Sequence, residues 1–275
     1  MDMTWCLMPF RNNIPMTRQA VEDCLAQSVP TRVLLIDQGA SEPDRRAVDD
    51  WLDGRPDQRV LVWHWNPPLP SLSAAWNRGL RFVWELGGTE ALVVNNDVRL
   101  APSTVQVLSK VRTVYDALFV SAVGVKEGQF DPVVVFDPEL TGAQKGGPDF
   151  SCFLLSREGH DKYPFDESFI PCYCEDLDMH RRYMLGGDGA RIFSVNLPFL
   201  HYASGTIKAY SPEERAKFNK GYEQVVQRYT QKWGGPPNQE TFFSPFDQGV
   251  EGVGTAGMPN PPTTPALQAW VQGRG

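Results

Sequence analysis

Short apolar runs recur at regular intervals in the first half of the chain. Runs of this length are typical of buried β-strands. Polar segments with apolar residues at helical spacing separate them, around residues 20–25, 48–52, 71–86 and 102–111. This alternation predicts βαβ units, and therefore an α/β fold with a mostly parallel central sheet flanked by helices. The predicted strands of this half are Trp5 to Met8, Val33 to Ile36, Val60 to Trp63, Ala91 to Val94 and Leu118 to Val123.

After about residue 125 the apolar runs are separated by loop-rich sequence. Further strands are predicted at Val133 to Phe136, Phe150 to Leu155 and Arg191 to Val195. The second half therefore still contributes strands, but without the regular βαβ rhythm of the first.

A late helix has a well-marked beginning and end. Ser211 is a capping residue, Pro212 suits the first helical position, and Glu214 can close a capping box. We expect this helix to end before Gly234. The segment 236–275 is rich in Pro and Gly and poor in core-forming residues, which predicts a tail that is extended or wraps the surface.

Composition and charge exclude some classes of protein. The 275 residues carry 33 Asp and Glu against 26 Lys and Arg, a formal net charge of −7, which argues against a protein that coats nucleic acid. Neither a 20-residue apolar run nor a secretory signal is visible, so we expect no integral membrane segment. The five scattered cysteines form no C-x-x-C pair, which favours a reducing compartment and a cytoplasmic location.

Polar residues follow several of the predicted strands. In an open parallel sheet the ligand lies outside the carboxyl ends of the strands, where amides and carboxylates can contact the ribose and base of a nucleotide. Asp and Asn are also common in turns and helix caps, so each residue alone has a purely structural interpretation. Together they predict a nucleotide site that includes Pro9, Asn12, Asp37, Asn66 and Asn96.

Among these candidates, Asp97 has the most specific predicted role. It follows a buried strand directly, where a hard cation held by one or two carboxylates and substrate phosphates is expected. The chain has neither a G-x-x-x-x-G-K-[ST] loop nor a G-x-G-x-x-G after a strand. A diphosphate would therefore be held through a metal ion.

A second cluster of acidic residues lies between residues 165 and 182. Glu175 and Asp176 are adjacent, and neighbouring carboxylates raise one pKa, which suits a general base. The structural alternative is an acidic first turn of a helix, with Arg181 and Arg182 on a later turn. His201 follows another apolar run, where a lone histidine is more often a structural residue than a ligand. Its hydrogen-bonding neighbours Tyr202, Ser204 and Thr206 favour a place in a site.

The order of these motifs resembles that of family 2 glycosyltransferases of the GT-A fold. The resemblance covers about residues 4 to 235 and rests on six elements in the family's order. They are Asp37 to Ser41, like the D-x-x-S element; Asn66 with Ala74 to Gly79, which includes Asn77; Asn95-Asn96-Asp97 in the place of D-x-D; Phe165 to Phe169 with Glu175 to Asp178, like the FDE and ED block; His201; and Lys232-Trp233-Gly234.

The resemblance implies a GT-A domain over residues 1–235, with a nucleotide-binding half to about 125 and an acceptor half from 126. It implies transfer of a sugar from a nucleotide-diphosphate donor to an acceptor hydroxyl with inversion. Mn²⁺ or Mg²⁺ would be held by Asp97 and His201, and Asp176 would be the base beside Glu175. Asn77 joins the nucleotide-binding residues.

Two departures from the family pattern affect the site. Only the last acidic position of D-x-D is present, and the acceptor-side glycine pair matches Gly146-Gly147, displaced by Pro148-Asp149. A non-catalytic nucleotide-sugar or glycan-binding module on the same fold is the alternative, and a nucleotidyltransferase is a third. The acceptor is a glycan, a protein side chain or a modified DNA base, and the donor sugar and oligomeric state are open.

Overall fold

The computed structural model of the chain describes residues 3–55, 57–65, 67–131, 143–144, 148–202 and 205–248. Nine strands in this described part form one sheet. They are β1 Thr4–Phe10, β2 Thr31–Asp37, β3 Val60–Trp63, β4 Glu90–Val94, β5 Val98–Arg99, β6 Phe119–Val125, β7 Ala143–Gln144, β8 Cys152–Ser156 and β9 Ile192–His201. The predicted strand Val133 to Phe136, the residue Asn66 and the tail from residue 249 lie outside the described residues.

The sheet is parallel in its first half and mixed in its second. The strand order is β3-β2-β1-β4-β8-β6-β9-β5, and β7 also pairs with β9. Strands β1 to β4 are parallel, as predicted. β8 is antiparallel to both β4 and β6, so the mostly parallel arrangement does not continue through the second half.

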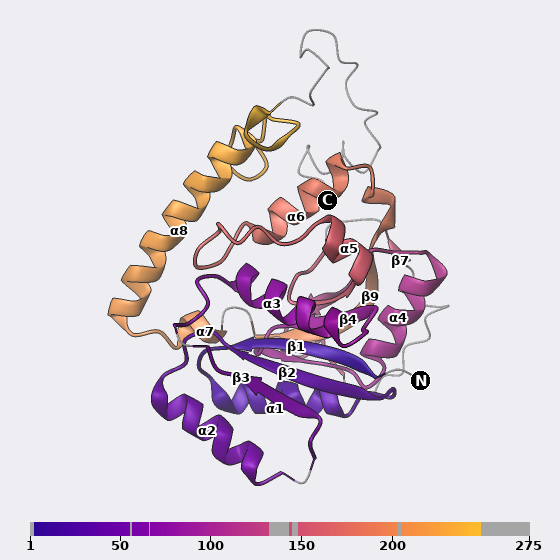
Figure 1. Cartoon of the computed structure of the whole chain (residues 1–275), viewed down its shortest axis with the longest axis vertical. Helices are drawn as coiled ribbons and strands as arrows, with labels where there is room; N and C mark the ends of the chain where they lie inside the picture. The colour runs from indigo at the N-terminus through magenta and orange to yellow at the C-terminus, as the bar shows by residue number, and fades with distance from the viewer. Residues whose placement is uncertain are drawn as a thin grey trace.

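Helices cover both faces of the sheet. They are α1 Ile14–Leu25, α2 Glu42–Asp53, α3 Leu72–Glu85, α4 Thr104–Val114, α5 Arg157–Lys162, α6 Glu175–Leu185, α7 Gly205–Lys208 and α8 Pro212–Trp233, with 3₁₀ turns at Gly189–Arg191 and Pro245–Asp247. Figure 1 shows α1 and α2 on one side of β1 to β3 and α3 on the other. Within the described residues, no helix combines the length and apolar character needed to cross a membrane.

The sheet has a hydrophobic core on each face, and the side chains of β1 point alternately into one and the other. Met8 and Phe10 pack with residues of α1, α2 and α4, whereas Trp5 and Leu7 pack on the other face with residues of α3 and α6. Successive side chains of a strand point to opposite faces, so a strand that is apolar throughout requires cover on both.

Side-chain caps fix several helix ends. The hydroxyls of Ser41 and Ser71 accept hydrogen bonds from the first turns of α2 and α3. Ser211 and Glu214 form the predicted capping box of α8, and Gly234 ends that helix with φ 73°. Caps of this kind satisfy amide groups that a helix terminus leaves without a partner.

The far end of α8 is fastened to α6 and to the segment before it. Lys232 Nζ lies 2.6 Å from both Asp166 Oδ2 and Asp178 Oδ1. Trp233 donates to Asp178 Oδ1 at 3.0 Å, and Phe169 is buried in the same small core. The predicted Lys232-Trp233-Gly234 element is therefore an anchor for α8.

Candidate functional site

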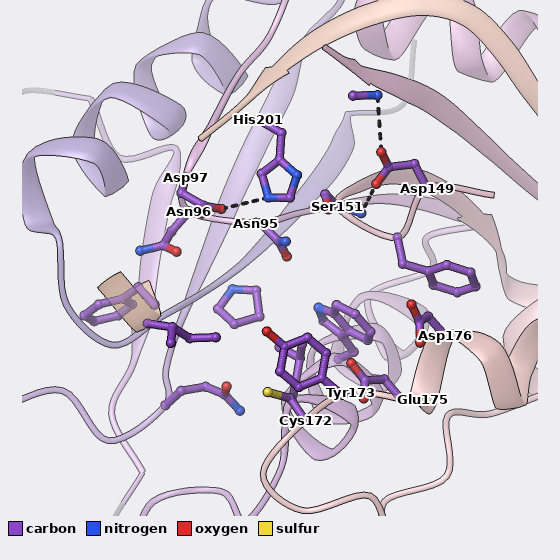
Figure 2. Close-up of a pocket in the computed structure, with 18 of the residues that line it drawn as sticks. Asn95, Asn96, Asp97, Asp149, Ser151, Cys172, Tyr173, Glu175, Asp176 and His201 are labelled. Atoms are coloured by element: carbon purple, nitrogen blue, oxygen red, sulfur yellow. Dashed lines mark hydrogen bonds and ion pairs between the residues drawn. The ribbon is translucent and has the colours of Figure 1, made fainter. Parts of the chain in front are cut away.

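A cavity of about 640 Å³ opens at the carboxyl ends of β1 and β4. One wall is built from the residues after β4 and the end of β9, which bring Asp97 and His201 together. The opposite wall is the turn into α6, with Glu175 and Asp176. Figure 2 shows these two groups facing the same space, with Asp149 above Asp176 in this view. The cavity thus lies where the sheet topology places a ligand.

Strand pairing brings Asp97 and His201 together. Val98 of β5 is the register partner of His201 in β9, and the amide of Tyr202 donates to the Asp97 carbonyl at 3.0 Å. As a result, His201 Nε2 lies 3.5 Å from Asp97 Oδ1. Burial lowers the pKa of His201, but the Asp97 hydrogen bond and the charges of Asp97 and Asp149 outweigh this, so the pKa is raised.

Asp97 and His201 fit a divalent cation as a two-residue site. Asp97 is only 5% exposed, and both side chains line the cavity. In the described ranges, no group of three or more His, Cys, Asp or Glu side chains could hold a metal ion. A cation here would therefore need further oxygen ligands from a substrate or water, which is how Mg²⁺ is commonly bound beside phosphates.

The acid pair lies at the first turn of α6, as the structural interpretation of the sequence required, and it also lines the cavity. Asp176 accepts a hydrogen bond from the Leu177 amide at 2.8 Å. Among the described residues, nothing hydrogen-bonds to Glu175 Oε2, which is buried. A carboxyl group in this position favours its neutral form.

Burial and nearby negative charges raise the pKa values of Glu175 and Asp176 to different extents. Burial raises the pKa of Glu175 far above its usual range, and the charge of Asp176 raises it further. Burial also raises the pKa of Asp176, as does the charge of Asp149, while the amides of Leu177 and of Asp176 itself lower it. The pair can therefore hold one proton on Glu175 while Asp176 carries the negative charge.

Asp149 is a third carboxylate of the site, and the sequence analysis assigned it no role. It lies before β8, and its two oxygens accept from the Ser151 amide at 2.9 Å and the Gly124 amide at 3.2 Å. A Cβ on Gly124 would lie 2.8 Å from Asp149 Oδ2, so glycine permits this close approach. The signal in the sequence was only an acidic residue at the start of an apolar run, inside a Pro- and Gly-rich stretch.

Pro9, Asn12 and Asn96 lie at the base of the cavity or beside it. Pro9 and Asn96 line the cavity. Asn96 uses its amide nitrogen to bind Thr17 Oγ1 at 2.9 Å and the Asn12 carbonyl at 3.1 Å. These contacts hold the loop after β1 against the loop after β4.

Asp37 and Asn77 lie outside the described cavity lining. Asp37 is fully buried, and its carboxylate accepts from the amides of Gly39 and Ala40, from Arg45 and from His64. Burial raises the pKa of Asp37, but these partners, His64 first, lower it below its usual value. Asp37 thereby fixes the turn that carries Gln38, which does line the cavity.

Asn77 joins α3 to the segment before α6. Its amide nitrogen donates to the Phe165 carbonyl at 2.8 Å and to Glu167 Oε1 at 3.0 Å. Its oxygen accepts from the Phe165 amide at 3.0 Å and lies 3.0 Å from His160 Nε2. The hydrogen-bonding capacity of this amide is thus used inside the protein.

Solved structures share this fold. A mannosyltransferase, PcManGT from Pyrobaculum calidifontis in complex with GDP-Man and Mn²⁺, matches with a TM-score of 0.59 and 15% identity over 85% of this chain and 66% of that one. Residues 1–349 of S. aureus TarS in complex with UDP-GlcNAc match with a TM-score of 0.54 and 13% identity over 82% of this chain and 66% of that one. The chain therefore spans just under two thirds of the length of these two solved chains, and 40% of a longer TarS chain.

These matches show that the chain has the fold of GT-A glycosyltransferases. No protein-family model matches the sequence, and no curated protein does. At such low identities the likeness concerns the fold alone, so a function must be argued from the site.

Proposed function

We propose that the chain is a glycosyltransferase that moves a sugar from a nucleotide-diphosphate donor to an acceptor hydroxyl, with inversion and with a divalent cation. The observation that supports this is one cavity with two unlike walls. Asp97 and His201 form a polar wall suited to a cation and a diphosphate, and the buried acids Glu175 and Asp176 form the other.

The donor would lie along the loops after β1, β2 and β4. Pro9 and Asn96 contact the cavity directly, and Asn12 holds Asn96 through its carbonyl. For Asp37 and Asn77 the geometry favours an indirect role, because each keeps a neighbouring segment in place. Asn66, outside the described residues, stays a predicted nucleoside contact.

Asp97 and His201 would hold Mn²⁺ or Mg²⁺ together with oxygens of the diphosphate. When bound, such a cation offsets the negative charge that develops on the leaving group. Asp97 is also hydrogen-bonded to His201, so the two side chains of this wall hold each other in position.

The chemical step would be a single displacement. The acceptor hydroxyl oxygen forms a bond to the anomeric carbon, and the bond from that carbon to the diphosphate oxygen breaks with its electron pair on the diphosphate. The hydroxyl proton passes to the carboxylate of Asp176. Because the acceptor attacks opposite to the leaving group, the configuration inverts. Glu175, kept protonated by burial and by its neighbour, leaves Asp176 as the ionised member.

The non-catalytic alternative has one observation in its favour. Asn96, in the middle of the altered D-x-D element, uses its amide nitrogen on Thr17 and Asn12 rather than on the cavity. A binding module would take up the nucleotide sugar but release no nucleotide diphosphate. Measuring that release with and without an acceptor separates the two functions.

The test of the proposed function is a thermal-stabilisation screen. UDP-GlcNAc and GDP-Man are added with Mn²⁺, with Mg²⁺ or with EDTA, because a ligand that binds only the folded state raises the melting temperature. We expect at least one nucleotide sugar to stabilise the chain with a metal ion and much less with EDTA. Asp97→Asn should lose this difference, whereas the control Asp53→Asn, an exposed acid at the end of α2, should keep it. No stabilisation by either nucleotide sugar, or equal stabilisation in Asp97→Asn, would contradict the proposal.

A further inference from the structure

Four aromatic side chains form a continuous row from the cavity onto α8. Tyr173 and Tyr210 line the cavity, and Phe218 and Tyr222 lie four residues apart on α8, so they share a face of that helix. The ring of Tyr173 has its centroid 5.3 Å from that of Tyr222 and 5.7 Å from that of Phe218, and Phe218 lies 5.8 Å from Tyr210. We call these four side chains the aromatic rim.

The aromatic rim is only partly covered by protein. Tyr173 is 37% exposed and Tyr222 is 44% exposed, while Tyr210 and Phe218 are half-buried. Large exposed apolar side chains usually occur singly on a protein surface. A contiguous group of them at the edge of a cavity indicates a ligand-binding surface.

A single backbone turn positions both the ring of Tyr173 and the acid pair of Glu175 and Asp176. Tyr173 has φ 81° and Cys174 has φ 63°, a left-handed conformation that residues with a side chain rarely adopt. Glu175 and Asp176 follow directly. Disfavoured backbone of this kind persists where the surrounding structure fixes it, and it is concentrated at functional sites.

The aromatic rim lies on the acceptor side of the cavity. Figure 2 shows Tyr173 beside Glu175, on the wall opposite Asp97 and His201. In the proposed reaction the diphosphate occupies the wall of Asp97 and His201, and the attacking hydroxyl must reach Asp176. A molecule that rests on Tyr173 is therefore in place to present a hydroxyl to this acid.

α8 is packed so that its aromatic face meets the turn. A Cβ on Gly221 would lie 2.8 Å from Cδ of Pro171, so the missing side chain lets the helix approach the residues before Tyr173. Phe218 and Tyr222 flank this point of contact and reach Tyr173 from α8. The aromatic rim thus depends on a close contact between two segments that are distant in sequence.

The chemistry of the aromatic rim favours a sugar ring as its occupant. A pyranose has a face of C–H groups and an edge of hydroxyls, and tyrosine offers a flat apolar ring with a polar tip. The exposed residues of α8 around the rim carry both signs of charge, with Glu213 and Glu223 among Lys217 and Lys220. A helix that binds an anionic membrane would instead carry a uniformly basic polar face.

We propose that the aromatic rim is an acceptor subsite and that the acceptor is a saccharide, with its terminal ring on Tyr173 and the preceding ring on Tyr222. This inference rests on the proposed function for its direction, because only a transfer reaction distinguishes donor from acceptor. The binding of saccharide to the aromatic rim is itself measurable without catalysis.

The experiment is saturation-transfer NMR on the full chain. The probes are methyl β-glucoside, methyl β-galactoside, methyl α-mannoside and methyl β-N-acetylglucosaminide, each with a disaccharide of the same sugar. They are titrated in the presence of Mg²⁺, which is diamagnetic, and with or without UDP and GDP. We expect transfer to the C–H protons of a ring face for at least one sugar, with tighter binding of its disaccharide. Tyr222→Ala should raise the Kd of that disaccharide roughly tenfold and leave that of the monosaccharide nearly unchanged.

Matched variants separate ring stacking from a loss of structure. Tyr222→Phe keeps the ring and should restore most of the affinity. Tyr115→Ala removes another exposed tyrosine, 51% exposed at the end of α4 and outside the cavity lining, and should bind as the wild type does. Unfolding of Tyr222→Ala would appear as a lowered melting temperature, in which case Tyr222→Phe compared with Tyr222→Gln carries the test.

Three results would overturn the inference. The first is the absence of saturation transfer to any of the sugars, and the second is an unchanged disaccharide Kd in Tyr222→Ala. The third is binding to vesicles of phosphatidylcholine and phosphatidylglycerol that Tyr222→Ala abolishes, which would assign the aromatic rim to a membrane surface. The proposed function has a separate test, because it fails if neither nucleotide sugar stabilises the chain. The sugar titrations without nucleotide do not depend on that result.

Discussion

His201 Nε2 lies 3.5 Å from Asp97 Oδ1, although Asp97 precedes β5 and His201 ends β9, far apart in the sequence. The pairing of β5 with β9 creates this contact, so the polar wall of the cavity depends on a strand of only two residues, Val98–Arg99. An imidazole that faces a carboxylate across a cavity wall can share a cation with it.

His201→Gln should weaken the cation-dependent part of donor binding. Loss of one of two protein ligands is expected to lower metal affinity by about 10- to 100-fold, by analogy with outer-shell partners, whose loss costs that much. Calorimetric titration of the stabilising nucleotide sugar with Mn²⁺ and with EDTA measures the effect. Equal affinities of the variant and the wild type in Mn²⁺ would remove His201 from this role.

Asp176→Asn should lower kcat by about 10² to 10⁴ because the amide cannot accept the hydroxyl proton. Donor affinity should be nearly unchanged, since the proposed donor contacts lie on the opposite wall. Steady-state kinetics of nucleotide diphosphate release, together with a donor titration, measure both quantities. Asp161→Asn, an exposed acid on α5, is the control. Near wild-type turnover in Asp176→Asn would exclude it as the base.

Asp149→Asn should move the acidic limb of the kcat/KM profile to lower pH. The charge of Asp149 raises the pKa of Asp176, so removing that charge makes ionisation of Asp176 easier and its pKa falls. Activity that requires ionised Asp176 then persists to a lower pH. The pH profiles of variant and wild type give the comparison. A limb that stays in place or moves to higher pH would contradict the assignment of that limb to Asp176.

Gly124→Ala offers an independent test of the same carboxylate. The new Cβ would lie 2.8 Å from Asp149 Oδ2, which is too close, so the carboxylate must move and lose the amide of residue 124. We expect the acidic limb to shift in this variant as well, whereas Gly128→Ala, with open space around its Cβ and φ 88°, should affect local stability only. Identical profiles for Gly124→Ala and the wild type would show that the position of Asp149 does not matter.

His160 should make the fold less stable in mild acid. Trp84 donates to His160 Nδ1 at 2.9 Å, so the proton of the neutral ring lies on Nε2, which faces Asn77 Oδ1. Burial, and then the charge of Arg81, lower the pKa of His160 to about 4. In the unfolded chain this histidine takes up a proton near pH 6.5, whereas in the folded chain it stays neutral down to about pH 4. Its contribution to the free energy of unfolding is therefore complete above pH 6.5 and falls as the pH drops toward 4.

The size of this effect is on the order of 3 kcal/mol for a shift of this extent. Denaturant unfolding between pH 7 and 4 measures it, with His160→Gln as the variant. His180, whose pKa burial also lowers to about 4, contributes a term of the same sign, so His160→Gln should reduce the pH dependence without abolishing it. An unchanged slope would mean that His160 is not held neutral in the folded chain.

Much of the fold could be predicted because it is encoded locally. The apolar runs at residues 5–8, 33–36, 60–63 and 91–94 became β1 to β4 with extensions of at most two residues at either end. The capping box at Ser211 was visible as well, since its residues are neighbours in sequence. The direction of β8 was not predictable, because an apolar run looks the same in a parallel and an antiparallel strand.

Residues of the cavity lining were predictable where a polar residue follows an apolar run or two acids are adjacent in the sequence. Asp97, His201, Glu175 and Asp176 were predicted, and the structure brings all four to one cavity. Asp37 and Asn77 also belong to the motifs that predicted the site, but their side chains hydrogen-bond to other parts of the protein. No local sequence pattern reveals these contacts. Asp149 was missed because its place in the cavity lining depends on a contact with Gly124, which is distant in sequence.

The position of β8 bears on how the chain is made. β8 hydrogen-bonds to β4 on one side and β6 on the other, yet it is synthesised after both. On the ribosome, the facing edges of these two strands must wait until residue 156 has emerged. Until then the facing edges of β4 and β6 lack the partner that pairs with them in the finished sheet, and unpaired strand edges favour aggregation.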